Sequence, residues 1–284
     1  MKKFLFKGFM APVFTAYHDD KEKTINYEII PAYAKYLKAK GVNAVLVNGT
    51  SGEGMLLNVD ERIKVADVWK KACTENDMII MVQIGGAPFP DVVTLAKHAE
   101  KADVDAILCL PELFFKPNSP EKLTEYLRNV ALHCPTIPLF YYHIPMFTDV
   151  NVHMPKFLDL AEKAIPNFGG IKYTSAELDQ GSSCLMPGRT IFLGADSILC
   201  PAVAAGFDSF IMTTLNIFPE LSAKIVRCMQ NNDVEEARSV QQELNKKIYE
   251  ILKYGDWVTA MKRAFNERCD LNLGKTRAPL SFDV

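Results

Sequence analysis

Short apolar runs alternate with longer amphipathic stretches along most of the 284-residue chain. Each run is apolar on both faces and rich in Val, Ile, Phe or Leu, which is typical of parallel strands covered on both sides by helices. The runs are Phe9–Phe14, Ala44–Val47, Ile79–Ile84, Ala106–Leu110, Pro138–Tyr142, Gly169–Tyr173, Thr190–Leu193 and Ser209–Thr213. Such an α/β alternation predicts a closed (β/α)8 TIM barrel or a doubly wound sheet. Because no dinucleotide fingerprint follows the first run, we expect the barrel.

Amphipathic stretches that fit helices fill the gaps between the runs. They are Ile25–Lys40, Val59–Cys73, Asp91–Ala102, Glu121–Leu132, Lys156–Lys163, Glu177–Leu185, Ile198–Ala205 and Glu220–Gln230. Asn58 stands directly before the second stretch, where its side chain is a favourable N-cap.

Only helical stretches follow the last predicted strand. Val234–Leu252 and Trp257–Asn266 have no strand between them. We therefore predict a catalytic barrel domain over residues 1–232, and a C-terminal helical appendage over residues 233–284 that packs on the barrel.

Acidic and basic residues nearly balance, at 34 and 32, for a formal net charge of −2. No long run has one sign of charge, which argues against nucleic acid or a membrane surface as a partner. No apolar run approaches the roughly 20 residues that a membrane-spanning helix needs. By elimination, we expect a small-molecule substrate.

The seven cysteines are odd in number, widely spaced and without a C-x-x-C pair. This pattern argues against a disulfide framework or a zinc site and favours reduced thiols. The start, Met1–Phe6, has some features of a signal peptide, but Lys7 interrupts it and no convincing cleavage site follows. We therefore expect a cytoplasmic protein.

Lys172 lies at the end of the sixth predicted strand. In (β/α)8 barrels the active site lies at the C-terminal ends of the strands. Burial disfavours the ammonium form of a lysine, and a neutral amine can form a Schiff base with a carbonyl substrate. The alternative is a strand-end lysine that extends to water.

Tyr141, Tyr142 and His143 end the fifth predicted strand. A phenol at this position can transfer protons to and from a substrate. We expect at least one of the two tyrosines to be a core aromatic instead. His143 has no carboxylate or histidine at metal-ligand spacing, so we expect a hydrogen-bonded structural histidine.

Loops rich in glycine and hydroxyl groups follow three other predicted strands. Asn48–Gly54 contains three glycines, and its N–H groups and hydroxyls can hold a carboxylate or phosphate, although many such turns bind nothing. Gly194, Asp196 and Ser197 follow the seventh strand, and Thr213 lies at the eighth. Their hydroxyls and carboxylate suit the recognition of a polyol.

Three motifs together resemble the dihydrodipicolinate synthase / N-acetylneuraminate lyase family of pyruvate-dependent aldolases. They are Gly49-Thr50-Ser51-Gly52-Glu53, Tyr142-x-x-Pro145 and Gly170-Ile171-Lys172, in the order and at the strands typical of the family. The similarity extends from Ala11 to about Asn216. Within the family, the chain is most similar to the animal-type N-acetylneuraminate lyases. Met146-Phe147 stand where the dihydrodipicolinate synthases have an arginine that holds a second carboxylate.

The resemblance implies a Schiff-base aldolase that cleaves N-acetylneuraminate to N-acetylmannosamine and pyruvate. It implies no metal or organic cofactor, because the lysine imine is the electron sink, and it implies a homotetramer. Lys172 corresponds to the imine-forming lysine and Tyr142 to the group that relays protons. The implied substrate-binding residues are Thr50 and Ser51 at the keto-acid carboxylate, Thr174 at the hydroxyl that loses its proton, and Gly194, Asp196, Ser197 and Thr213 along the sugar.

Two departures from the family pattern lie on the sugar side. Ser197 stands where the lyases usually have a glutamate, and Met212 where they usually have a glycine. A shorter 2-keto-3-deoxy sugar acid is therefore an alternative substrate for the same mechanism. A further alternative is a non-catalytic keto-acid or sugar binder, against which the joint presence of Lys172, Tyr142 and Thr50 argues.

Overall fold

The computed structural model describes residues 4–281, whose parallel strands form a closed barrel in sequence order. The strands are β1 Gly8–Pro12, β2 Ala44–Val47, β3 Ile79–Gln83, β4 Ala106–Cys109, β5 Leu139–His143, β6 Phe168–Tyr173, β7 Thr190–Leu193 and β8 Ser209–Ile211. The predicted (β/α)8 barrel is confirmed.

Helices follow the strands and continue beyond the last of them. They are α1 Ile30–Ala39, α2 Val59–Glu75, α3 Phe89–Ala102, α4 Pro120–Ala131, α5 Pro145–Thr148, α6 Met154–Ala164, α7 Leu178–Ser183, α8 Leu199–Ala204, α9 Pro219–Gln230, α10 Val234–Leu252 and α11 Trp257–Arg268. Short 3-10 helices, η1 Gly54–Leu56, η2 Asp196–Ile198 and η3 Thr213–Asn216, follow β2, β7 and β8. The sequence analysis missed these 3-10 helices and α5.

Several predicted boundaries differ from the observed ones, and two of the differences have a clear cause. Helix α1 begins at Ile30 rather than Ile25, because Pro31 fits only the first turn of a helix. Ile25 instead pairs with Tyr17 in an isolated antiparallel bridge. Strand β8 ends at Ile211, because the chain turns into η3 at Thr213.

The N-cap of α2 is as predicted. The Asn58 side chain accepts the N–H of Glu61 at 2.9 Å, and the Glu61 carboxylate accepts the N–H of Asn58 at 3.0 Å. Together the two bonds form a capping box, which satisfies backbone donors that the first turn leaves unpaired.

The described residues fall into two compact units. The first unit contains the described part of Met1–Gly8, with Met81–Ala195 and Ala202–Ile211. The second unit contains Phe9–Ile80, Asp196–Pro201 and the described part of Met212–Val284. The predicted division into residues 1–232 and 233–284 stays a prediction.

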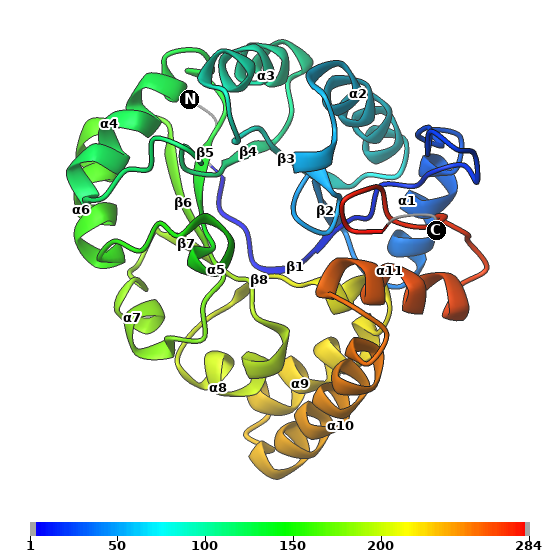
Figure 1. Cartoon of the computed structure of the whole chain (residues 1–284). Helices are drawn as coiled ribbons and strands as arrows, with labels where there is room; N and C mark the ends of the chain where they lie inside the picture. Colours follow the sequence, from blue (N-terminus) through cyan, green and yellow to red (C-terminus); the bar gives the residue numbers. More distant parts are fainter. Residues whose placement is uncertain (1–3, 282–284) are drawn as a thin grey trace. The chain divides into compact units, whose positions relative to one another are not determined.

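Each unit has an apolar core of its own. In the first, the rings of Phe140 and Phe192 lie 5.6 Å apart. In the second, Phe265 of α11 packs against Phe14 and Tyr33, with ring centroids 5.9 and 5.0 Å apart. Helices α9 and α10 of the second unit lie side by side (Figure 1). Aromatic packing of this kind ties α11 to residues near the start of the chain.

No helix within residues 4–281 combines the length and the apolar character that crossing a membrane requires. Part of the start that has signal-peptide features, Met1–Lys3, lies outside the described residues.

Candidate active site

The first unit brings the Lys172 amine and the Tyr142 phenol together. The two residues are register partners in the parallel pair β5–β6, so their side chains leave the same face of the sheet. Lys172 Nζ donates to Tyr142 Oη at 2.9 Å and lies 4.1 Å from the centre of the phenol ring. Lys172 is only 4% exposed. The alternative of a lysine that extends to water is therefore excluded.

The opposite face of β5 and β6 carries the aromatic residues next to this pair. Tyr141 packs edge-on against Phe157 of α6, with ring centroids 5.2 Å apart. His143 stacks on Tyr173 at 5.1 Å, and burial lowers its pKa to about 4. Tyr141 is therefore the core aromatic of the two tyrosines, as expected for at least one of them. His143 is a buried neutral imidazole on the helix-facing side.

Thr174 and Gly194 lie beside the amine. The Thr174 hydroxyl is buried and has no hydrogen-bond partner within the described chain. A Cβ at Gly194 would lie 2.0 Å from that hydroxyl oxygen and 3.2 Å from Lys172 Cε. Gly194 thus leaves the space that Thr174 and Lys172 occupy. An unpaired buried hydroxyl is costly unless a ligand satisfies it.

In the second unit, the loop after β2 is tightly wound. A Cβ at Gly54 would lie 2.0 Å from the Asn48 carbonyl oxygen, so only glycine fits there. The Thr15 hydroxyl donates to the Gly52 carbonyl at 2.6 Å, and the Glu53 N–H donates to the Thr50 carbonyl at 3.0 Å. These contacts hold the loop in one conformation.

Ser51 and Thr213 are brought together in the same unit. Their hydroxyl oxygens lie 2.9 Å apart, and both side chains are buried. The Trp257 indole N–H also donates to the Thr213 hydroxyl, at 3.1 Å. Sequence reasoning missed Trp257, which belongs to the helical appendage. Its position directly after Asp256, an N-cap residue, marks only the start of a helix.

A buried ion pair, which the sequence analysis also missed, supports the loop after β2 at Glu53. Lys262 of α11 donates to the Glu53 carboxylate at 3.0 Å, with 1% and 0% of the two side chains exposed. The other Glu53 oxygen accepts the Arg277 N–H at 2.9 Å. Burial lowers the pKa of Lys262 to about 8, against the opposing effect of Glu53. Burial also raises the pKa of Glu53, against the opposing effects of Lys262 and Arg277.

Asp196 and Ser197 differ in surroundings. Asp196 is buried, and its carboxylate accepts the N–H of Thr214 at 2.8 Å, where η3 begins. Burial raises the pKa of the Asp196 carboxyl, and its bonds to Thr214 counteract this rise. Ser197 is exposed, and its carbonyl accepts from Asn245 at 3.2 Å. One oxygen of Asp196 therefore has a structural role.

The structure holds the predicted residues as separate clusters. Lys172, Tyr142, Thr174 and Gly194 lie together in the first unit, and Ser51 and Thr213 lie together in the second. Among residues 4–281 no group of three or more His, Cys, Asp or Glu side chains is arranged to hold a metal ion. All seven cysteines are free.

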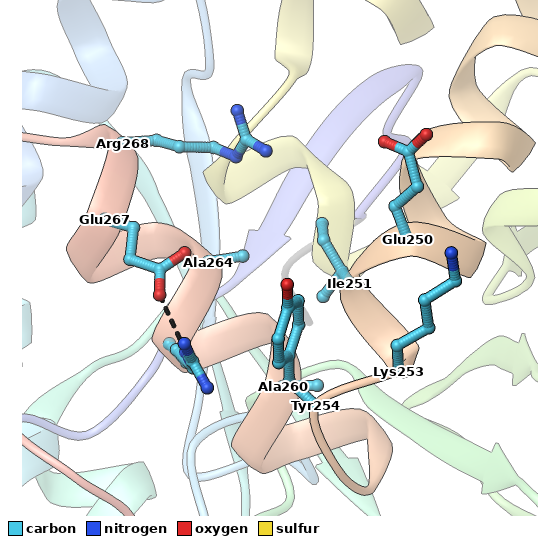
Figure 2. Close-up of a pocket in the computed structure, with 9 residues that line it drawn as sticks. Glu250, Ile251, Lys253, Tyr254, Ala260, Ala264, Glu267 and Arg268 are labelled. Carbon is cyan, nitrogen blue, oxygen red and sulfur yellow. Dashed lines mark hydrogen bonds and ion pairs between the residues drawn. The ribbon is translucent and has the colours of Figure 1, made fainter.

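A surface pocket of about 340 Å³ on the second unit contains none of the predicted residues. Figure 2 shows Glu250 of α10 and Lys253, directly after this helix, on one side, and Glu267 and Arg268 of α11 on the other. Arg263 pairs with Glu267 at 2.7 Å, and this exposed pair is worth little.

Comparisons with known proteins match almost the whole chain. The profile of the dihydrodipicolinate synthetase family matches residues 5–282. The N-acetylneuraminate lyase of Xenopus tropicalis is 30% identical over 98% of this chain and 92% of its own length. The solved sialic acid aldolase of Aliivibrio salmonicida is 32% identical, with a TM-score of 0.92 over 99% of this chain and 92% of its own. The Proteus mirabilis N-acetylneuraminate lyase is 30% identical, with a TM-score of 0.91 over 97% and 92%.

Proposed function

The chain belongs to the dihydrodipicolinate synthetase family, and from this premise we propose that it is a Schiff-base aldolase acting through Lys172. The observation that carries the proposal is the buried amine of Lys172, 2.9 Å from a phenol. No carboxylate pairs with this amine within residues 4–281. An amine at the carboxyl end of a barrel strand can form a Schiff base with a keto acid.

We propose N-acetylneuraminate as the substrate and N-acetylmannosamine and pyruvate as the products, because the relatives above are lyases of this sugar acid. The Lys172 amine attacks the keto carbon and water leaves, which forms the protonated imine. The substrate hydroxyl beside the breaking bond then loses its proton and becomes the aldehyde of N-acetylmannosamine. As the carbon–carbon bond breaks, its electron pair moves into the imine to form an enamine. The enamine carbon takes up a proton, and hydrolysis of the resulting imine releases pyruvate and the free amine.

Two residues next to the amine fit the proton transfers. Tyr142 is within hydrogen-bond distance of Lys172 Nζ and is proposed to relay protons during imine formation and hydrolysis. The unpaired Thr174 hydroxyl is proposed to accept from the substrate hydroxyl that loses its proton. Gly194 leaves room for both.

On the carboxylate side, we propose that Thr50 and Ser51 bind the keto-acid carboxylate through hydroxyl and backbone N–H groups. The rigid glycine-rich loop supports this role, because fixed donors lose little entropy on binding. Asp196, Ser197 and Thr213 are proposed to line the sugar end. These residues all follow strands at the carboxyl ends, where barrel enzymes have their sites.

A shorter 2-keto-3-deoxy sugar acid is the second candidate substrate. The Asp196 carboxylate already accepts the Thr214 N–H, and Ser197 has no carboxylate to offer. Fewer acceptors then remain for a long polyol tail, while the amine and phenol are unaffected.

We further propose a cytoplasmic homotetramer, with the chemistry in residues 1–232 and the helices of residues 233–284 supporting it. Phe114, Phe115, Met146 and Phe147 of the first unit are all largely exposed, and large apolar side chains left exposed in this way support an interaction surface. The seven free cysteines support a reducing compartment.

Trapping with borohydride tests the proposed function. The protein is incubated with pyruvate and reduced, and the modified peptide is mapped by mass spectrometry, with Lys172→Ala as control. A stable adduct on Lys172, absent from the control, is expected. Absence of the adduct from folded wild-type protein would contradict the proposal and favour a non-catalytic binder. Release of pyruvate from N-acetylneuraminate and from 2-keto-3-deoxy sugar acids then separates the two substrates.

A further inference from the structure

Trp257 begins α11, and its indole N–H is aimed at a hydroxyl chain that ends in the loop after β2. Asp256 caps the helix by accepting the N–H groups of Val258 and Thr259, which fixes the backbone at Trp257. Trp257 Nε1 donates to Thr213 Oγ1 at 3.1 Å, and Thr213 Oγ1 lies 2.9 Å from Ser51 Oγ. All these residues belong to the second unit.

The chemistry of the groups sets a direction along this chain. An indole N–H is only a donor, so the Thr213 oxygen must accept from it. A hydroxyl that accepts a hydrogen bond becomes a stronger donor. Thr213 is therefore disposed to give its own proton to Ser51. The Ser51 proton then has no role toward Thr213 and is free for a third group.

A carboxylate bound next to Ser51 would favour the arrangement in which the Ser51 proton points away from Thr213. Carboxylate oxygens only accept hydrogen bonds, and bonds from neutral donors to charged acceptors are among the stronger ones. The loop around Ser51 is held by Thr15 at Gly52 and by Lys262 at Glu53. Because the loop is held on both sides of Ser51, what can still change there is the direction in which its hydroxyl proton points.

We propose that Trp257 is a positioning residue that, through Thr213, aims the Ser51 hydroxyl proton at the carboxylate of the keto acid. The inference rests on the proposed function, because it takes the ligand of Ser51 to be that carboxylate. It gives α11 a part in substrate binding. The Thr213 hydroxyl then serves as a relay between Trp257 and Ser51, in addition to the place proposed for Thr213 beside the sugar.

The test measures the pyruvate concentration that gives half-maximal borohydride trapping on Lys172. In Trp257→Phe, which loses the N–H and keeps an aromatic ring, this concentration is expected to rise roughly three- to tenfold, the effect of one hydrogen bond. Trp257→His keeps a ring N–H and is expected to recover part of the loss. With methyl pyruvate, whose ester is uncharged, the same substitution is expected to change the concentration less than about twofold.

A double-mutant cycle decides whether Trp257 acts through Ser51. Adding Trp257→Phe to Ser51→Ala is expected to cause little further increase, since the aimed proton is already gone. Arg263→Met, on the exposed face of α11, is the matched control and is expected to match wild type. Thr213→Val interrupts the relay at its middle, and it replaces Trp257→Phe if circular dichroism finds that variant unfolded.

The outcomes separate the two proposals. Wild-type protein without an adduct on Lys172 overturns the proposed function and this inference with it. Wild-type protein with the adduct, combined with unchanged half-maximal concentrations in Trp257→Phe and Thr213→Val, overturns the inference alone. Additive effects of Trp257→Phe and Ser51→Ala also overturn it.

Discussion

Lys172 and Lys262 are both buried lysines, but their partners differ. Lys172, in the first unit, donates to the phenol of Tyr142, and Lys262, in the second, donates to the Glu53 carboxylate and the Lys275 carbonyl. Both amines also lie over a tyrosine ring, Tyr142 and Tyr17, at 4.1 and 4.2 Å. Burial and an aromatic neighbour are therefore common to the two sites, and the counter-ion is the difference.

That difference gives Lys262 a structural role and fits the catalytic role proposed for Lys172. A buried carboxylate at 3.0 Å stabilises the ammonium form of Lys262, and the Lys275 carbonyl accepts another of its protons. An ammonium has no lone pair for attack on a carbonyl. Lys172 has a phenol in place of that carboxylate, which fits the proposed Schiff-base role. Burial alone thus does not identify a catalytic lysine.

The largest expected effect is on catalysis at Lys172. Lys172→Met removes the amine and keeps the length of the side chain, so aldol cleavage is expected to fall by at least about 10⁴-fold. The midpoint of thermal unfolding should change little, because no buried counter-ion is left unpaired. Pyruvate release and differential scanning calorimetry measure the two quantities. Residual activity near that of wild type contradicts the assignment.

Lys262→Met is expected to reverse this pattern. It leaves Glu53 buried without its cation, which should lower the free energy of unfolding by about 3–5 kcal/mol. The double variant Glu53→Leu/Lys262→Met removes both charges and is expected to recover much of the loss. Urea unfolding measures both. A single variant as stable as wild type would show that the pair contributes nothing.

Tyr142→Phe tests the partner that distinguishes Lys172. The substitution keeps the ring and removes the proton-transfer group, so kcat is expected to fall by about 10²-fold. Tyr141→Phe is the matched control on the opposite face of β5, and its kcat should stay within about twofold of wild type, since the Tyr141 ring packs against His143 and against Phe157 of α6. Equal losses in the two variants would contradict the assignment of Tyr142.

His143, on the face of β5 opposite the amine, is expected to make the stability of the protein depend on pH. Because its pKa is about 4 when folded and about 6.5 when unfolded, the unfolded state binds more protons between these values. Stability is then fully present above about pH 6.5 and is lost as pH falls toward 4. Between pH 7 and pH 5 the loss is roughly 2 kcal/mol, and His143→Phe should flatten it. Urea unfolding at both pH values measures the slope.

The strands of the barrel could be read from local patterns. Ala44–Val47 and Thr190–Leu193 have the predicted bounds. Both strands are buried along their whole length, so the apolar run in the sequence begins and ends where the strand does. The predicted start of α1 was wrong because the constraint that Pro31 places on a helix was overlooked. The predicted end of β8 was wrong because the group that holds the turn at Thr213 is distant in the sequence. A hydrogen bond to the first turn of η3, from the Thr214 N–H, is accepted by Asp196 on another segment.

The sequence by itself determined the alternating pattern of the barrel, the family and the candidates Lys172 and Tyr142, since each depends on residues close together in the chain. The position of Tyr141 and Tyr142 in the chain left open which of them lies beside the amine; the family resemblance indicated Tyr142, and the register of β5 and β6 places Tyr142 there. The tertiary structure alone paired Glu53 with Lys262 across 209 positions and Ser51 with Thr213 across 162. The residues that surround a position in the sequence do not predict a contact with a residue so far along the chain. The charge of a buried lysine depends on that partner more than on its neighbours in sequence.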